Sequence, residues 1–307
     1  MARVTVPTVE PRPELPAAEP RSERRPNSQA NARRNEDEAG LDAGLSQKET
    51  APLRSELGRI AEVYPARYGV LVLDPSTGET VAMDADETFL AASLNKLPVL
   101  LALYRSAARG EVDLDDEITM QASDVQAYGT GVLYTRPVGY TLTLRECARL
   151  LIKESDNTAW KMLDRYLGRD YIRAELYRVG ARSTEYWIPN TTTPNDVLLI
   201  LKKISDPSYT TPFLSAEMLD VMTNTSFEDR LPQPLPEGTR VSHKIGSYGT
   251  TFSDAGLVIP AGSRDVKDAY FIVLMVSGTD KFTARAAIRE MSLATHRSLS
   301  GEHKSDS

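Results

Sequence analysis

The sequence has little cysteine, little histidine and no long hydrophobic run, and each shortage excludes a class of protein. Cys147 is the only cysteine, so no disulfide can form within the chain and the redox compartment cannot be inferred; its apolar helical context predicts a core residue. The histidines, His243, His296 and His303, lack metal-ligand spacing, so we expect neither a zinc hydrolase nor any metal or cofactor. No run of about 18 apolar residues occurs, so no membrane span is expected.

Basic charge is also scarce. The 307 residues include 36 lysines and arginines against 43 aspartates and glutamates, which gives a formal net charge of -7. A nucleic-acid partner would require a basic face, so none is expected. Hydrophobic residues make up 41% and charged residues 26% of the chain, as in an ordinary soluble globular protein, and its length allows one large domain or two modest ones.

Residues 1–50 contain no aromatic side chain and are rich in proline, arginine, glutamate and asparagine. Such a composition cannot bury enough apolar surface to offset the entropy of ordering, so we predict that residues 1–50 and the tail 300–307 are disordered. A signal peptide would need an apolar stretch of about 7–15 residues, which the first 50 residues lack. We therefore expect either a cytoplasmic protein or a chain without the export segment of its gene product.

From residue 51 onwards, apolar residues recur with the periods of strands and helices. Strand patterns stand towards both ends of this region, in residues 68–74, 79–83, 241–246, 252–259 and 269–277. Helix patterns fill its middle and its two borders, in residues 53–64, 97–108, 142–153, 158–167, 170–179, 194–204, 215–222 and 281–298. The turn Pro75–Gly78 joins the first two strands in a predicted hairpin.

This order of elements predicts an α/β fold of the α+β type. One antiparallel sheet of about five strands would be built from both ends of the domain and flanked by helices, with an all-helical subdomain inserted between them. We assign the domain to residues 51–299. Residues 51–90 and 236–299 would form its α/β part, and residues 91–235 its helical part.

A candidate nucleophile and a candidate base stand at the head of an apolar helix pattern, in the stretch FLAASLNKLPVLLALY (residues 89–104). Ser93 and Lys96 are three residues apart, so their side chains would share one face of a helix. A desolvated lysine can take the proton of a serine hydroxyl and so activate it as a nucleophile. About one such S-x-x-K pair is expected by chance in a chain of this length, so the pair alone carries little weight.

Two further short motifs follow. Ser155–Asn157 reads S-D-N directly after a helix pattern, where all three residue types can also serve to cap a helix. Lys244–Gly246 reads K-I-G on the first of the late strands, where a surface lysine beside a glycine bulge is an alternative interpretation. Each motif is weak by itself, and their order along the chain is what points to a function.

In this order, S-x-x-K at a helix start, S-D-N after a helix and K-x-G on a late strand are the motif set of penicillin-recognising serine enzymes. Over about residues 53–299 the chain resembles class A β-lactamases. The resemblance implies a serine hydrolase that forms an acyl-enzyme with a small-molecule β-lactam or a peptidoglycan-like substrate. It also implies a monomer located outside the cytoplasm, although the sequence shows no export signal.

The resemblance assigns roles to individual residues. Ser93 would be the nucleophile, Lys96 its general base or proton relay, and Ser155 the group that passes the proton to the leaving nitrogen. The substrate would be bound by Asn157, Lys244, Gly246, Ser247 and Tyr128. The backbone N–H groups of Ser93 and Ser247 would form the oxyanion hole. For Tyr128, a packing role and a functional role have equal weight.

Two departures from the family pattern weaken substrate affinity or turnover, but not acylation as such. Class A enzymes hydrolyse the acyl-enzyme with a glutamate on a long loop, whereas the loop of residues 180–190 is short and lacks the E-P-x-L-N signature. Glu185, the only carboxylate there, has the wrong context, and Glu154 is a candidate only because it precedes the S-D-N motif. Ile245 replaces a hydroxyl residue that helps to bind the substrate carboxylate, and Arg230 is a weak substitute for a missing arginine. We therefore predict slow hydrolysis of the acyl-enzyme.

Two other functions stay open. The same motifs serve D,D-peptidases and esterases that act on cell-wall peptides or other acyl substrates. A catalytically silent penicillin-binding scaffold is the third possibility, favoured by Ile245 and by the missing glutamate. The complete set of Ser93, Lys96 and Ser155 argues against it.

Overall fold

The computed structural model describes residues 51–263 and 265–300. The segment 1–50 lies outside the described residues, and of the predicted disordered tail only Ser300 is described, at the end of the last helix. The helices are α2 (Ala51–Val63), α3 (Lys96–Ala108), α4 (Leu144–Lys153), α5 (Asn157–Leu167), α6 (Arg169–Arg178), α7 (Pro194–Ser205), α8 (Pro212–Val221) and α9 (Lys281–Leu299). The short 3-10 turns are η1 (Ala92–Asn95), η2 (Ala122–Asp124), η3 (Leu133–Thr135) and η4 (Val266–Asp268).

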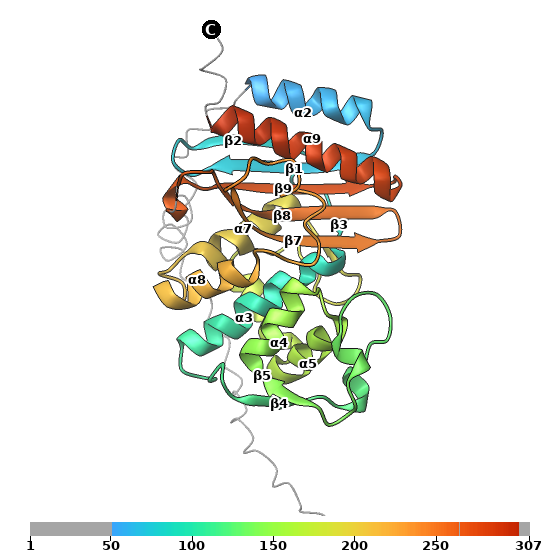
Figure 1. Cartoon of the computed structure of the whole chain (residues 1–307), viewed down its shortest axis with the longest axis vertical. Helices are drawn as coiled ribbons and strands as arrows, with labels where there is room; N and C mark the ends of the chain where they lie inside the picture. The colour runs from blue at the N-terminus through green and yellow to red at the C-terminus, as the bar shows by residue number, and fades with distance from the viewer. Residues whose placement is uncertain (1–50, 264, 301–307) are drawn as a thin grey trace, which may run out of the picture. The chain divides into compact units, whose positions relative to one another are not determined.

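The strands are β1 (Arg67–Asp74), β2 (Glu79–Met83), β3 (Phe89–Leu90), β4 (Glu117–Thr119), β5 (Thr141–Thr143), β6 (Thr191–Thr192), β7 (Arg240–Tyr248), β8 (Thr251–Ile259) and β9 (Tyr270–Ser277). Five of them form one antiparallel sheet in the order β2-β1-β9-β8-β7. Figure 1 shows how strands from the two ends of the domain lie side by side in this sheet. The predicted fold is therefore confirmed, including the hairpin of β1 and β2.

Two small sheets, β3-β6 and β4-β5, are absent from the prediction. Their strands have only two or three residues, which is too short for an alternating pattern to be recognised. The β3-β6 pair matters for the site because it joins the chain just before η1 to the loop that precedes α7. The division of the domain at residues 90 and 235 stays a prediction.

Each face of the large sheet packs against its own helices. Val70 and Val72 of β1 belong to the apolar cluster formed with α2 and α9, whereas Leu71 and Leu73 belong to the cluster formed with α3, α4 and α7. Successive side chains of a strand point to opposite faces, so a strand covered on both sides becomes apolar throughout. This explains the continuous apolar runs of β1 and β9, and Figure 1 shows α2 and α9 together on one side of the sheet.

Helix α3 places its first residue deep inside the protein. Ten of its 13 residues are buried, among them Lys96. A helix that is buried on most sides is surrounded by other elements, and α3 packs against α4, α5, α6, α7 and α8. Pro98 is tolerated because the N–H groups of the first helical turn have no partner within the helix. Lys96 therefore enters an environment that excludes most water.

Cys147 in α4 is a core residue, as predicted. It is fully buried, and its thiol donates a hydrogen bond to the carbonyl of Ala159, with 3.7 Å between sulfur and oxygen. Burial raises the pKa of this thiol, which keeps it protonated and unreactive at neutral pH.

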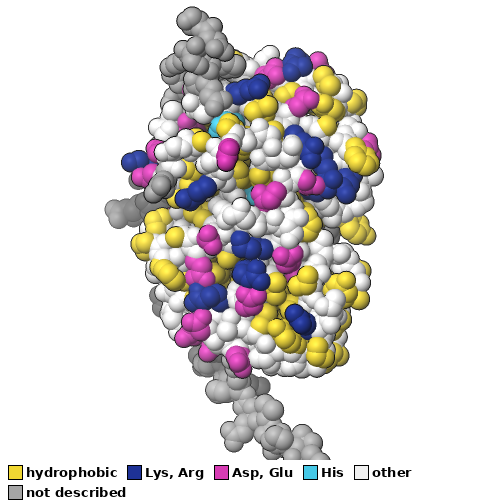
Figure 2. All heavy atoms as spheres, in the orientation of Figure 1, with side chains coloured by type: hydrophobic (Ala, Val, Ile, Leu, Met, Phe, Trp, Pro, Cys, Tyr) yellow, Lys and Arg dark blue, Asp and Glu magenta, His cyan; other side chains and the backbone are white. Residues whose placement is uncertain are grey.

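The surface carries both signs of charge. On the face drawn in Figure 2, basic and acidic side chains are interspersed over the described residues. Within residues 51–263 and 265–300, no helix has both the length and the apolar character that crossing a membrane requires.

Candidate active site

Ser93 and Lys96 lie side by side where η1 leads into α3. Oγ of Ser93 is 3.1 Å from Nζ of Lys96. The serine stands in the 3-10 turn and not in the α-helix itself, and residues i and i+3 of such a turn eclipse each other. Ala92 just before it has a φ of 48°, a strained value for a residue with a side chain, and such strain concentrates at functional sites.

Oxygen atoms surround the amine of Lys96. Nζ lies 2.6 Å from the carbonyl oxygen of Ser155, 3.1 Å from Oγ of the same residue and 2.7 Å from Oδ1 of Asn157. The residue is only 2% exposed, and burial lowers the pKa of Lys96 to about 7, although the negative charge of Asp156 opposes this shift. A lysine with this pKa is partly a free amine at neutral pH, which is the form that accepts a proton.

The Ser155–Asn157 loop combines a helix cap with two side chains of the site. Asp156 is buried and caps α5 by accepting a hydrogen bond from the N–H of Ala159, and it accepts two further N–H groups from residues 132 and 133. Ser155, with a φ of 50°, and Asn157 stand on either side of this anchor and meet Lys96. The capping and the functional interpretations of the S-D-N motif are therefore compatible.

Lys244 on β7 reaches the hydroxyl of Ser155 from another side. Its Nζ lies 2.9 Å from Oγ of Ser155 and 3.2 Å from the carbonyl oxygen of Ile245. Burial, together with the positive charge of Lys96, holds the pKa of Lys244 well below its usual range. The hydroxyl of Ser155 is thus shared by two lysine amines, an arrangement suited to passing a proton onward.

Strand β7 passes so close to η1 that its backbone leaves no room for a side chain at position 246. A Cβ on Gly246 would lie 2.7 Å from the carbonyl oxygen of Ala91 and 3.3 Å from Cγ of Leu94. Gly246 therefore contributes space, which lets the strand approach the turn that carries Ser93.

Replacing Gly246 by alanine is expected to lower the free energy of unfolding by about 1–3 kcal/mol, because the added carbon must push the strand away from a backbone carbonyl. Urea or thermal unfolding would measure the loss. Gly58→Ala is the matched control, since a Cβ at Gly58 in α2 would meet nothing within 4 Å. That substitution should be neutral or stabilising by up to about 1 kcal/mol. Equal stability of the Gly246 variant and the wild type would contradict the close approach.

The outer side of β7 presents backbone N–H groups to the site. β7 is an edge strand, and the N–H of His243 donates outside the sheet, to the carbonyl of Met222 at 2.9 Å. Residues two apart on a strand direct their N–H groups to the same side, so those of Ile245 and Ser247 also point away from β8. This orientation suits the predicted oxyanion donor on Ser247.

Arg230 supports the end of β7 from behind. Its side chain is 3% exposed, and its guanidinium donates hydrogen bonds to the carbonyls of Gly246, at 3.0 Å, and Ser253, and to Oγ of Ser247. Ile245 is also buried but contributes to the wall of the cleft. The idea that Arg230 binds a substrate carboxylate stays a prediction, since all three of these contacts are within the protein.

Ser93, Lys96 and Ser155 lie on the wall of a cleft of about 530 Å³, whereas Lys244 and Gly246 stand behind its lining. It is lined by Leu90, Ala92, Ser93, Asn95, Lys96, Tyr128, Gly129, Thr130, Ser155, Asn157, Trp160, Pro189, Asn190, Ile245, Ser247 and Tyr248. Tyr128 is 70% exposed at its mouth, and its carbonyl accepts a hydrogen bond from Nδ2 of Asn157 at 3.0 Å. Among these lining residues there is no aspartate and no glutamate. A groove of similar volume between α2 and α9 is lined by no serine–lysine pair of this kind.

The predicted candidates for a carboxylate base lie away from the cleft lining. Glu185 is exposed, and its backbone pairs with Thr191 at the edge of the small sheet. Glu154 accepts a hydrogen bond from the hydroxyl of Ser226 at 2.6 Å. In the described part of the chain, neither residue lines the pocket that contains Ser93.

Two cleft features went unnoticed in the sequence. Asn95 donates a side-chain hydrogen bond to Oδ1 of Asn190, and the carbonyl of Asn190 accepts the N–H of Ala91 at 2.9 Å. The ring of Trp160 lies 4.9 Å from that of Trp187, between centroids, which fixes the loop that carries Asn190. No short motif marks these residues, because each acquires its role from a partner distant in the chain.

Comparisons with known proteins agree with this fold. A model of the Beta-lactamase enzyme family matches residues 52–299. A β-lactamase of Streptomyces fradiae is 29% identical over 279 residues, which cover 83% of this chain and 87% of the relative. A mutant of PBP-A, solved as an acyl-enzyme complex with penicillin G, has a TM-score of 0.77 at 25% identity and covers 83% of this chain and 98% of that one. A β-lactamase of Sphaerobacter thermophilus has a TM-score of 0.72 at 26% identity, with 80% and 97% covered.

Proposed function

The chain belongs to the Beta-lactamase enzyme family, and on this premise we propose that it is a serine hydrolase that forms a covalent acyl-enzyme through Ser93 with β-lactams or related amides. The observation that carries the proposal is the contact of Lys96, with a pKa of about 7, with the hydroxyl of Ser93 at 3.1 Å. No metal or cofactor is needed for this chemistry.

The contacts of Lys96 indicate how Ser93 is activated. The carbonyl oxygen of Ser155 and Oδ1 of Asn157 can only accept hydrogen bonds, and both lie within 2.7 Å of Nζ. A neutral amine has two hydrogens, which these oxygens take, so its lone pair is left for the proton of Ser93. Oγ of Ser93 then attacks the carbonyl carbon of the amide, and its proton passes to Lys96.

The amide bond breaks when its nitrogen receives a proton. Ser155 stands between Lys96 and Lys244 and would donate its own proton to the leaving nitrogen while regaining one from Lys96. The oxyanion of the intermediate would accept hydrogen bonds from the N–H groups of Ser93 and Ser247. Asn157, Lys244 and Tyr128 would position the substrate beside them.

Release of the acyl group is proposed to be slow. Hydrolysis requires a base that activates water, and a base typically contributes about 100- to 10,000-fold in rate. The cleft-lining residues of the described chain include no carboxylate that could serve. The protein would therefore bind penicillins covalently and turn them over weakly.

Among residues 51–263 and 265–300, no carboxylate lines the cleft, which favours a second candidate function, a D,D-peptidase or esterase that acts on a cell-wall peptide or another acyl substrate. Similarity to PBP-A, whose mutant was captured with penicillin G, supports this reading. Cell-wall peptides and the drugs that mimic them act outside the cytoplasm, so we place the protein there as well, as a monomer.

Intact-mass spectrometry after mixing with a penicillin tests the proposal. We expect an adduct of the mass of the intact drug that persists, with slow colour development from a chromogenic cephalosporin. Ser93→Ala should give neither. Rapid colour that depends on Ser93 would overturn the slow-release proposal while keeping acylation. If neither an adduct nor colour appears, both the acylation proposal and the slow-release proposal are wrong. Another acyl substrate or a silent scaffold would then be left.

A further inference from the structure

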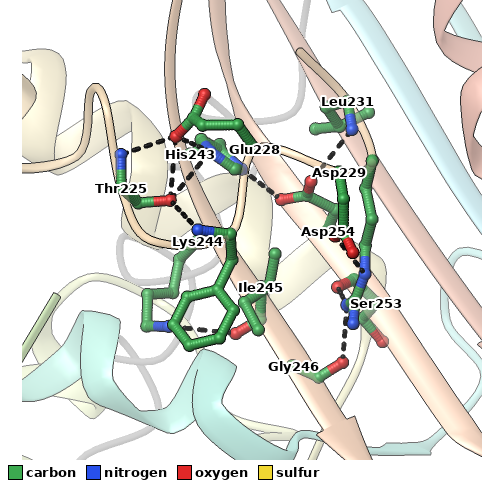
Figure 3. A network of polar contacts seen from close by, with 12 residues as sticks. Thr225, Glu228, Asp229, Leu231, His243, Lys244, Ile245, Gly246, Ser253 and Asp254 are labelled. Atoms are coloured by element: carbon green, nitrogen blue, oxygen red, sulfur yellow. Dashed lines mark hydrogen bonds and ion pairs between the residues drawn. The ribbon is translucent and has the colours of Figure 1, made fainter. Parts of the chain in front are cut away.

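An irregular segment, Thr225–Leu231, lies against β7 and β8 on the side that faces α9, where Leu231 packs in the α2–α9 cluster. Near its start, the N–H of Ser226 donates to the carbonyl of Lys153 at 3.0 Å, at the end of α4. At its end, the N–H of Leu231 donates to Oδ2 of Asp254 at 3.1 Å. The segment therefore connects the helix that precedes the S-D-N motif with the strands behind the cleft. Figure 3 shows its residues Thr225, Glu228, Asp229 and Leu231 beside His243 and Asp254 of the two strands.

His243 holds this segment to the sheet. Its ring is fully buried, with Nδ1 2.8 Å from Oδ1 of Asp254 on β8 and Nε2 3.1 Å from Oε1 of Glu228 in the segment. Gly256 stands directly opposite His243 in the sheet, and a Cβ there would lie 2.7 Å from that of His243. Because a carboxylate faces each ring nitrogen, both nitrogens can donate only when the ring is an imidazolium.

The charges around the ring favour the imidazolium. Burial alone would lower the pKa of His243, but the charges and hydrogen bonds of Asp254 and Glu228 raise it to about 9. The same contact holds the pKa of Glu228 below its usual value, although burial opposes this. Lys244, the next residue of the strand, directs its amine to Ser155, and Arg230 of the segment directs its guanidinium to the strand end.

A link from this ion cluster to the site runs through Arg230. Arg230 follows Glu228 by two residues, and its guanidinium holds the carbonyl of Gly246 and the hydroxyl of Ser247. The position of the segment therefore sets the position of the strand end that carries a proposed oxyanion donor. His243 itself does not line the cleft, so it can act on the reaction only through other residues.

We propose that His243 is a positioning residue for acylation: it bridges Asp254 and Glu228, and so fixes the Thr225–Leu231 segment in the place where Arg230 holds the end of β7 beside the nucleophile. The proposal rests on the proposed acylation of Ser93. It predicts that the site is correctly assembled only while the ring carries its second proton.

The pH dependence follows from the sign of each shift. Lys96 must be a free amine, so the acylation rate rises as the pH passes about 7. The ordinary pKa of a histidine is 6.5, and below this pH the imidazolium of His243 contributes its full stabilisation of the folded protein. This contribution is lost as the pH rises through about 9, where the ring loses its second proton. A plot of the wild-type acylation rate against pH should therefore be bell-shaped, with its maximum between about pH 7 and about pH 9.

The experiment measures the second-order acylation rate with a penicillin by time-resolved intact mass, from about pH 6 to about pH 10. His243→Gln should lower the rate and abolish the alkaline limb of the profile. This variant leaves Asp254 buried without its cation and can unfold. Glu228→Gln is the gentler companion, because the side chain of Glu228 is 40% exposed. In Glu228→Gln, the pH at which the rate falls on the alkaline side of the profile should be lower than in the wild type by roughly one unit or more.

His296→Gln is the matched control. His296 is also a buried histidine, and its Nδ1 lies 3.2 Å from the hydroxyl oxygen of Tyr270 on β9. It is not one of the three residues of the His243–Asp254–Glu228 bridge, so its removal should leave the shape of the profile unchanged. In parallel, proton NMR of the wild-type histidine rings reports the titration of His243 without any substrate. We expect it near pH 9.

An alkaline limb that stays unchanged in both His243→Gln and Glu228→Gln would overturn the proposal, as would a titration of His243 near 6.5. A structural role alone would lower stability and rate without changing the shape of the profile. If the proposed function itself is wrong, the result is different. No penicillin adduct would then form in the wild type or in any variant, while the NMR titration of His243 would still be observed.

Discussion

Replacing Lys96 by alanine is expected to slow acylation of Ser93 by about 100- to 10,000-fold, the usual contribution of a general base. Among the described residues, the amine of Lys96 is the only basic group that forms a hydrogen bond with Oγ of Ser93. Without it, the serine keeps its proton and remains a poor nucleophile. Time-resolved intact mass with a penicillin measures the rate.

The Lys96→Arg variant distinguishes the role of Lys96 as a proton acceptor from the effect of its positive charge. An arginine stays protonated at any accessible pH, so this variant keeps a positive charge beside Ser93 but cannot accept a proton. We expect it to acylate as slowly as the alanine variant. Circular dichroism would verify that both variants fold, because each disturbs a buried position. Near wild-type acylation by Lys96→Arg would show that charge alone is what Lys96 supplies.

Placing a carboxylate on the loop beside the cleft should convert slow release into turnover. In Ile188→Glu the new acid would stand next to Pro189 and Asn190, which line the cleft. As a base for water it should speed hydrolysis of the acyl-enzyme by about 100-fold. Ile188 is 75% exposed, so the substitution removes little core packing. Decay of the penicillin adduct and the rate of cephalosporin colour measure the gain.

Ile188→Gln is the matched control, because glutamine has the size and polarity of glutamate but cannot act as a base at neutral pH. It should keep the long-lived adduct of the wild type. If the glutamate variant also keeps that adduct, then a side chain at this position does not reach the acyl group, and the missing base would have to be restored elsewhere in the cleft.

Much of the fold could be predicted because its long elements have strong periods. The run of β9 is apolar throughout, as a strand buried on both faces requires, and α3 is buried on most sides. The close approach of the motif residues was predictable for a different reason, although their roles stay a prediction. The chemistry of acyl transfer demands particular side chains, and Ser93, Lys96 and Ser155 are recognisable from their order.

Other parts of the site depend on strand register and loop path, which local sequence does not encode. His243 was set aside in the sequence as a scattered histidine without metal-ligand spacing. Its proposed role depends on the register of β7 and β8, which places Asp254 diagonally across from it. Asn95 and Asn190 are similar, since the pair forms only because β3 and β6 bring their flanking segments together.

The buried thiol of Cys147 makes this protein convenient for site-specific labelling. Because the chain has no other cysteine and this one is inaccessible, a cysteine introduced at an exposed rim position would be the only reactive thiol. Tyr248, which is 73% exposed and lines the cleft, is such a position. A fluorophore attached there would report on occupancy of the cleft in real time, without any substitution in the wild-type core.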